Sequence, residues 1–163
     1  MAVLLQNHPT VLFPTVNTHV DVLNASQIIH YSIPQTQISI IIYTGSFISG
    51  PAMRDTLEAA ISAARAAMSK HGDVYMFPDP YMLRTPPALY TGLGIGAYST
   101  MVPGLKWADL ANMLLGVEQA MWQRANYKEA HVKMYDEPSG LEMGVADLHR
   151  MPAIKPADIS GVA

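Results

Sequence analysis

Three side chains, those of His131, Tyr98 and Glu142, are the candidates for acid–base chemistry in this chain. Histidine titrates near neutral pH, so an imidazole can serve as a general acid or a general base. We expect His131 to take that role and Glu142 to orient its ring across a hairpin. Tyr98 is expected to donate a hydrogen bond to the bound molecule or to stack on it.

A second set of side chains would line a site for a small molecule. Tyrosine stacks on ligands and donates hydrogen bonds, and methionine adapts to irregular apolar surfaces. The predicted ligand-binding residues are Ser39, Tyr43, Met76, Tyr81, Met82 and Tyr135. Both sets predict a small-molecule-binding protein with an apolar, aromatic or terpenoid-like ligand. The sequence leaves open whether the protein is an enzyme. If it is one, we expect a cofactor-independent isomerase, cyclase or dehydratase of secondary metabolism.

Other kinds of chemistry are disfavoured by the composition. The chain has no cysteine, and none of its six histidines pairs with another at helical spacing, so no thiolate nucleophile and no metal site are predicted. Gly92–Ala97 fits a loose G-x-G-x-x-A pattern, but strand-like residues follow where a dinucleotide site needs a helix. No cofactor is therefore predicted. Thirteen acidic and ten basic residues, a net charge of −3, argue against a nucleic-acid partner.

The elements that must position these side chains follow from periodicity and turn residues. Segments rich in isoleucine and tyrosine predict strands, and apolar residues at helical spacing predict helices. The first helix is expected to begin at Ser49 or Gly50, with Pro51 in its first turn, and to end at Gly72. The other expected elements are strands at 27–33, 37–43, 93–98, 131–135 and 141–148 and a helix at 105–124.

This order of elements predicts an α+β fold. We expect a two-layer sandwich in which a mainly antiparallel sheet of about five strands carries two helices on one face. A chain of this length is expected to form a single domain, residues 1–163. Three irregular parts are expected within it: an N-terminal arm at 1–26, a long loop rich in proline, methionine and tyrosine at 73–91, and a loose tail at 151–163.

Because side chains alternate along a strand, the sheet face that the helices leave uncovered can be predicted. The helix-facing set is Ile38, Ile40, Ile42, Leu93, Ile95, Val132, Met134, Met143 and Val145. The opposite set is Ser39, Ile41, Tyr43, Gly94, Gly96, Tyr98, His131, Lys133, Tyr135 and Glu142. This mixture of tyrosine, histidine and glycine is typical of a ligand pocket, with the arm and the 73–91 loop available as a roof. A dimer interface, or simple coverage by the arm, explains the same pattern equally well.

The alternative function is a non-catalytic interaction module in which this face is buried against another protein or a second copy, as a homodimer. No apolar stretch is long enough to cross a bilayer, so no membrane span is predicted. The N-terminus lacks the basic and long apolar regions of a secretory signal. The expected location is cytoplasmic if Met1 is the native start, and secreted if a leader has been removed.

Several segments carry a resemblance to known sequences. They are His30–Thr36, the isoleucine-rich strand ending at Tyr43–Gly45, the helix start at Ser49–Pro51, Leu105–Leu110 and Leu141–Gly144. In these features residues 29–148 resemble a widespread group of small, uncharacterised fungal α/β proteins. Its members often have Thr-Trp-Gly where this chain has Lys106, Trp107 and Ala108, and they usually begin with a signal peptide. The resemblance implies the same fold, and a secreted, effector-like protein as a further alternative.

Overall fold

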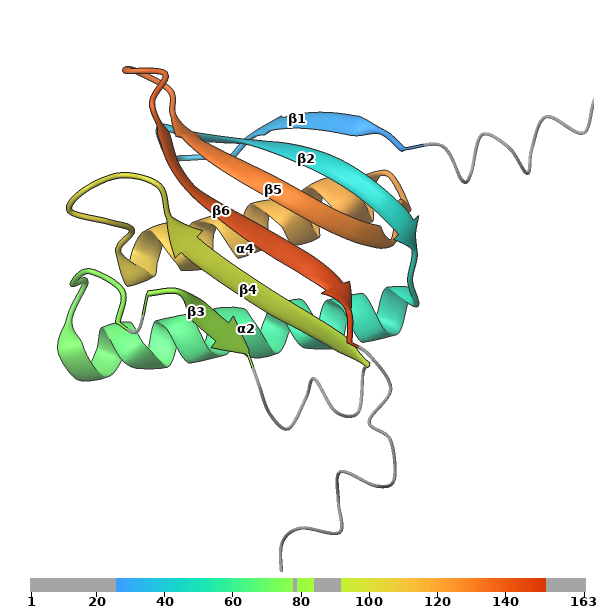
Figure 1. The fold of residues 1–163 in the computed structure, drawn as a ribbon, viewed down its shortest axis with the longest axis horizontal. Helices are drawn as coiled ribbons and strands as arrows, with labels where there is room; N and C mark the ends of the chain where they lie inside the picture. The colour runs from blue at the N-terminus through green and yellow to red at the C-terminus, as the bar shows by residue number, and fades with distance from the viewer. Residues whose placement is uncertain (1–25, 78, 84–91, 152–163) are drawn as a thin grey trace, which may run out of the picture.

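The computed structural model describes residues 26–77, 79–83 and 92–151. Its elements are β1 (Ile28–Ser32), β2 (Ile38–Phe47), α2 (Gly50–His71), β3 (Tyr81–Leu83), β4 (Leu93–Ser99), α4 (Trp107–Gln123), β5 (Lys128–Asp136) and β6 (Glu142–Arg150). The strands form one sheet in the order β1-β2-β5-β6-β4-β3, and each neighbouring pair is antiparallel. Both helices lie on one face of the sheet (Figure 1). The predicted α+β two-layer sandwich is confirmed.

The sheet has six strands within the described ranges, not about five. The additional strand, β3, lies inside the 73–91 segment that was expected to be irregular. It contains only three residues, with Pro80 immediately before it in the sequence, and a strand this short shows no period. Residues 84–91 of that loop lie outside the described part of the chain. So do the predicted arm and tail, except for Ser26 and Met151.

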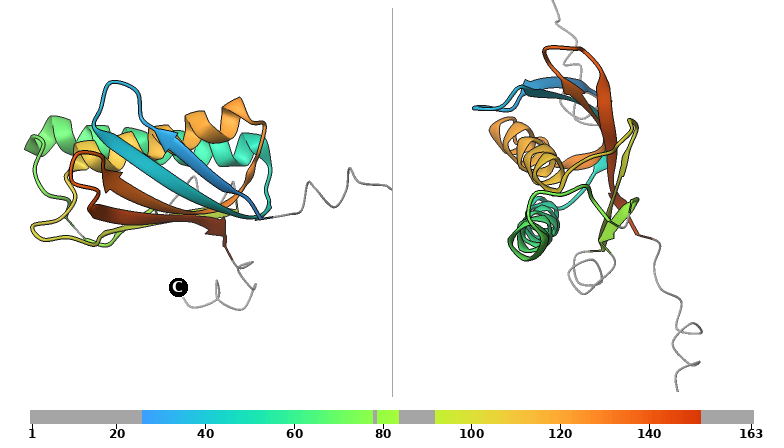
Figure 2. Two further views of the ribbon diagram at one scale, coloured as in Figure 1. Left: turned by 90° about the horizontal axis from the view of Figure 1, so that it is seen from above. Right: turned by 90° about the vertical axis from the view of Figure 1, so that its left-hand side faces the viewer.

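Helix α2 forms where its signals predict. The Ser49 hydroxyl accepts a hydrogen bond from the Ala52 N–H at 3.4 Å, and Gly72 ends the helix with φ +79°. Its apolar stripe is buried against the sheet and against α4. The two helices lie side by side and run in opposite directions (Figure 1), and the sheet curves around them (Figure 2).

Helix α4 begins at Trp107, two residues later than expected. Leu105 is fully buried in the turn before it, and the Leu105 N–H donates to the Ser99 hydroxyl at 2.7 Å. The helix start is fixed instead by Asp109, whose carboxylate accepts the Lys106 N–H at 2.9 Å. Burial raises the pKa of Asp109, and repulsion from Asp73 adds to the shift.

The side chains of β6 alternate between the two sheet faces in a different phase from the predicted one. This phase determines which β6 residues lie on the face away from the helices, the open face. Val145 pairs with Lys133 and Tyr98, so it lies on the open face; the expectation that it faces the helices is wrong. The cause is a β-bulge. Tyr135 pairs with Glu142 while Met134 pairs with Gly144, which leaves Met143 as an extra residue. Past the bulge, the helix-facing residues are Gly144, Ala146 and Leu148, and the open-face residues are Val145, Asp147 and His149.

Candidate functional site

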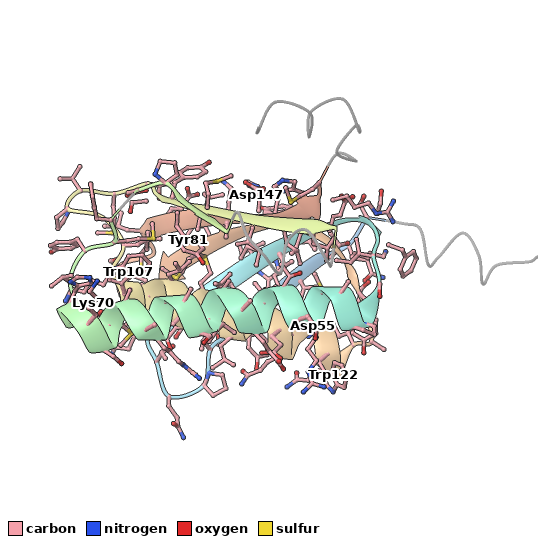
Figure 3. The ribbon with its side chains drawn as sticks, turned by 90° about the horizontal axis from the view of Figure 1, so that it is seen from below. Asp55, Lys70, Tyr81, Trp107, Trp122 and Asp147 are labelled. Atoms are coloured by element: carbon pink, nitrogen blue, oxygen red, sulfur yellow. The ribbon has the colours of Figure 1, made fainter. Side chains whose placement is uncertain are left out.

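The candidate site is the sheet face opposite the helices, which we call the open face. It is built by alternate residues of strands whose other side chains form the core. Its central members come from β2, β5, β6 and β4. The register places there Ser39, Ile41, Tyr43, His131, Lys133, Tyr135, Glu142, Val145, Asp147 and Tyr98. Figure 3 shows Asp147 on the side of the sheet away from α2.

His131 and Asp147 form the shortest polar contact between side chains described on this face. They are directly opposite each other on β5 and β6, and His131 Nδ1 lies 2.7 Å from Asp147 Oδ1. An ionised carboxylate only accepts hydrogen bonds, so Nδ1 carries the proton and Nε2 is the acceptor in the neutral ring. Nε2 has no hydrogen-bond partner among the described residues. Both side chains are about half exposed, at 43% and 45%, so the pair is open to a bound molecule.

Tyr43 borders this pair from the neighbouring strand. It is opposite His131 on β2, and the two ring centroids are 6.0 Å apart at an interplanar angle of 47°. A tilted aromatic contact of this kind limits the rotation of the imidazole. The imidazole is therefore restrained from β2 by Tyr43 and from β6 by Asp147.

Glu142, expected to orient His131, contacts different residues. Its carboxylate lies 3.0 Å from Lys133 Nζ and accepts a hydrogen bond from the Tyr135 hydroxyl at 3.4 Å. The hydrogen bond that Lys133 donates to Glu142 raises the pKa of Lys133, which stays cationic. Burial raises the pKa of Tyr135, and the nearby Glu142 charge adds to the shift, so the phenol stays a neutral donor. The orienting carboxylate is Asp147, which the bulge brings to this face.

The other predicted site residues are divided between the two faces. Tyr98 lies on the open face, but on β4, two strands away from His131 and about 10 Å across the sheet. Met76 and Tyr81 are buried in the core on the helix side and do not reach the open face. The Tyr81 ring meets the Trp107 ring edge-on at 6.0 Å (Figure 3). Burial raises the pKa of Tyr81.

The glycine positions of β4 are occupied by neighbouring side chains. A Cβ atom on Gly96 would lie 3.0 Å from Met82 Sδ, and one on Gly94 would lie 3.2 Å from Met151 Cγ. Met82 is thus the one residue of the three predicted in the 73–91 loop that lies on the open face, where it packs on Gly96. Because glycine has no side chain, Met82 can approach the β4 backbone at Gly96, and the surface there is covered and not open to a ligand.

A groove of about 460 Å³ lies at the end of the open face near the β5–β6 hairpin; we call it the hairpin groove. Its open-face lining is His30 and Ser32 of β1, Ser39 and Ile41 of β2, and Tyr135 of β5. Two predicted ligand-binding residues, Ser39 and Tyr135, are therefore brought together as direct cross-strand neighbours. His131 is four residues along β5 from Tyr135, about 13 Å at the usual strand rise.

Two residues of this site were not predicted from the sequence. Asp147 was missed because a bulge cannot be seen in a pattern of alternation, although its position in the second strand of a hairpin marked it as a potential partner of His131. His30 could not be predicted, because the groove beside it is formed by β1, β2 and β5, which are brought together only by the sheet order. Neither residue carries a motif of its own.

The comparisons with known proteins add no identity. No family model, no curated protein and no solved structure matches the chain. Within the described ranges, no three His, Asp or Glu side chains are grouped so that they could hold a metal ion. No helix of the described part is long and apolar enough to cross a membrane.

Proposed function

We propose that the protein binds an elongated apolar small molecule of aromatic or terpenoid type on the open face, and that His131 moves a proton from one carbon of this molecule to another. The observation that carries this proposal is the His131–Asp147 pair, at 2.7 Å. It is an arrangement that suits general acid–base catalysis: a carboxylate holds one ring nitrogen and leaves the other available.

The chemistry follows from the available nitrogen. In an isomerisation, Nε2 would take a proton from one carbon of the ligand and return it to another, so that no cofactor or co-reactant is consumed. Asp147 would stabilise the imidazolium that forms between the two steps. Tyr43, beside the ring, and Lys133, two residues along β5, are the donors that could stabilise a developing oxyanion.

The size of the ligand follows from the position of the hairpin groove. An apolar molecule resting on Tyr135 and Ile41 in the groove must extend about 13 Å along the strands to reach His131. Between the two ends it would pass over Lys133, which Glu142 holds at 3.0 Å. A fused or extended carbon skeleton of terpenoid or polyaromatic size fits this distance.

Binding is tested with the fluorescent dye 1-anilinonaphthalene-8-sulfonate and the full-length chain. We expect saturable binding that Tyr135→Arg weakens about 10-fold or more. Trp122→Arg, on the helix side of the molecule (Figure 3), is the matched control and should leave the affinity unchanged. Equal weakening by both variants would place the dye elsewhere.

Proton transfer is tested separately, in D₂O. Deuterium uptake into terpenoid ketones such as carvone, measured by mass spectrometry, is expected with the wild type and absent with His131→Gln. Asp147→Asn should retain binding but exchange deuterium more slowly, because the ring loses its charged partner. Glu118→Gln on α4 is the control. Uptake that survives His131→Gln would contradict the catalytic role and leave dye binding untouched.

A non-catalytic interaction module is the second candidate, and the apolar exposure of the same face favours it. Tyr43, Met82 and Tyr98 are all exposed there, and exposed aromatic and methionine side chains are enriched in protein interfaces. In that case Tyr98→Arg would abolish a protein complex while dye binding in the hairpin groove would be absent. A monomer that carries a co-purified apolar metabolite supports the ligand site instead.

A further inference from the structure

The outer edge of β1 carries backbone groups that point away from the sheet. In the described part of the chain, β1 is the outermost strand and pairs with β2 alone. The Thr44 N–H donates to the Gln27 carbonyl and the Ile33 N–H to the Ile38 carbonyl, each at 2.9 Å. Residues 27, 29, 31 and 33 therefore turn their backbone groups toward β2, and the alternate residues turn theirs outward. The outward residues are Ile28, His30 and Ser32.

This edge lacks the features that usually prevent strand pairing. Protected edges carry charged side chains, proline or a bulge, or are very short. β1 has five residues, with the sequence IIHYS, and pairs with β2 without a bulge. The opposite edge of the sheet, β3, has only three residues. Among the described residues no backbone group pairs with the outer side of β1, so it can accept another strand.

The side chains along the outer edge of β1 in one copy are complementary to those of the same edge in a second copy. Ile28 is 62% exposed at one end of β1, and Ser32 lines the hairpin groove at the other end. A two-fold axis through His30 would bring Ile28 of one copy opposite Ser32 of the other, twice. Each exposed isoleucine would then cover the rim of the other copy's groove.

We propose that β1 pairs antiparallel with β1 of a second copy, centred on His30. Ile28, His30 and Ser32 of each chain would exchange about six backbone hydrogen bonds, two for each facing pair. The two sheets become continuous, with both open faces on the same side. Sheet pairing of this kind uses main-chain groups for affinity and side-chain pockets for specificity.

The absence of cysteine permits a sharp test. In the full-length double variant Ile28→Cys/Ser32→Cys, facing residues of the two chains would have Cα atoms about 5.5 Å apart, within the range of a disulfide. The same two residues within one chain are about 13 Å apart along the strand and cannot bridge. We expect the double variant to form a covalent dimer under mild oxidation, and each single variant to remain uncross-linked. Equal cross-linking in the single and double variants would overturn the register.

The association itself is measured without cysteines, by sedimentation velocity over a range of protein concentration. We expect a dimer that His30→Pro abolishes, because proline removes an outward N–H and leaves the bonds to β2 in place. Circular dichroism checks that His30→Pro is folded. Ile28→Lys should also give a monomer, and it retains every backbone N–H. Tyr98→Arg on the open face should not affect the dimer. A wild type that stays monomeric up to about 1 mM, or a dimer that survives Ile28→Lys, would overturn the proposal.

Discussion

Replacing Gly144 with alanine tests the register of β6, which determines where Asp147 lies. A Cβ atom on Gly144 would be 2.4 Å from Leu105 Cδ1, 2.9 Å from Leu105 Cγ and 2.9 Å from the Tyr98 backbone oxygen. Non-bonded carbons prefer about 3.5–4.0 Å, so the methyl group overlaps Leu105 by about 1 Å or more. Leu105 is fully buried and the Tyr98 carbonyl belongs to a paired strand. Neither can move without further loss.

We expect Gly144→Ala to lower the free energy of unfolding by about 1–3 kcal/mol. For a chain of this length that is a decrease of about 2–12 °C in Tm. Urea unfolding followed by circular dichroism gives the free energy, and calorimetry gives Tm. Gly45→Ala is the matched control: its nearest contact would be Glu129 Cβ at 3.3 Å, and we expect a change within about 0.5 kcal/mol.

A double-mutant cycle assigns the cost to Leu105. In a Leu105→Ala background the clash with the Leu105 side chain is removed and the contact with the Tyr98 carbonyl remains, so Gly144→Ala should cost less there than in the wild type. An equal cost in both backgrounds would refute the reasoning. A Gly144→Ala variant as stable as Gly45→Ala would mean that Gly144 faces solvent. Asp147, three residues further along, would then lie beneath the helices, and its contact with His131 would not exist.

Three further predictions concern the helices. Burial raises the pKa of Glu118, and repulsion from Glu58 adds to the shift. A raised carboxyl pKa lowers the free energy of unfolding at a pH where the group is ionised. Glu118→Gln should therefore raise the free energy of unfolding by up to about 0.5 kcal/mol at pH 7, and urea titrations should show that this gain is lost below about pH 4. Ser49→Ala should lower stability by about 0.5–1 kcal/mol, the low end of the range because the cap bond is long; recovery in Ser49→Asp but not in Ser49→Val would confirm capping. Trp122 is exposed and Trp107 is buried, so Trp122→Phe should leave a blue-shifted emission that acrylamide quenches poorly, and unchanged quenching would contradict this placement.

The fold could be predicted because its main signals are local. Ser49, Pro51 and Gly72 bracket the first helix in the sequence, and the structure places α2 between the same residues. Alternation in β2 and β5 holds because both strands run through their centres without interruption, so Tyr43 and His131 share a face as expected. Two capped helices and strands joined in hairpins leave few arrangements other than a two-layer sandwich.

The site could be predicted only in part, because it depends on pairing between distant strands. A single extra residue at Met143 reverses the alternation of β6 beyond Glu142 and places Asp147 on the open face opposite His131, whereas Glu142 lies opposite Tyr135. Nothing in the residue types near the turn specifies where a bulge will form. Met76 and Tyr81 were expected at the site because of their loop, but β3 joins the edge of the sheet and turns Tyr81 into the core. Proline-rich sequence gives no indication of such a strand.

The two proposals make a joint prediction, because the β1 edge and the hairpin groove share His30 and Ser32. If Ile28 of a second copy covers the rim of the groove, a molecule bound there touches both chains. Binding and association then stabilise each other by the same free energy. The dye 1-anilinonaphthalene-8-sulfonate should bind about 5-fold more tightly at protein concentrations where the dimer dominates, and Ile28→Lys should remove this dependence. A dye affinity independent of protein concentration, with a dimer present, would show that the groove and the edge act separately.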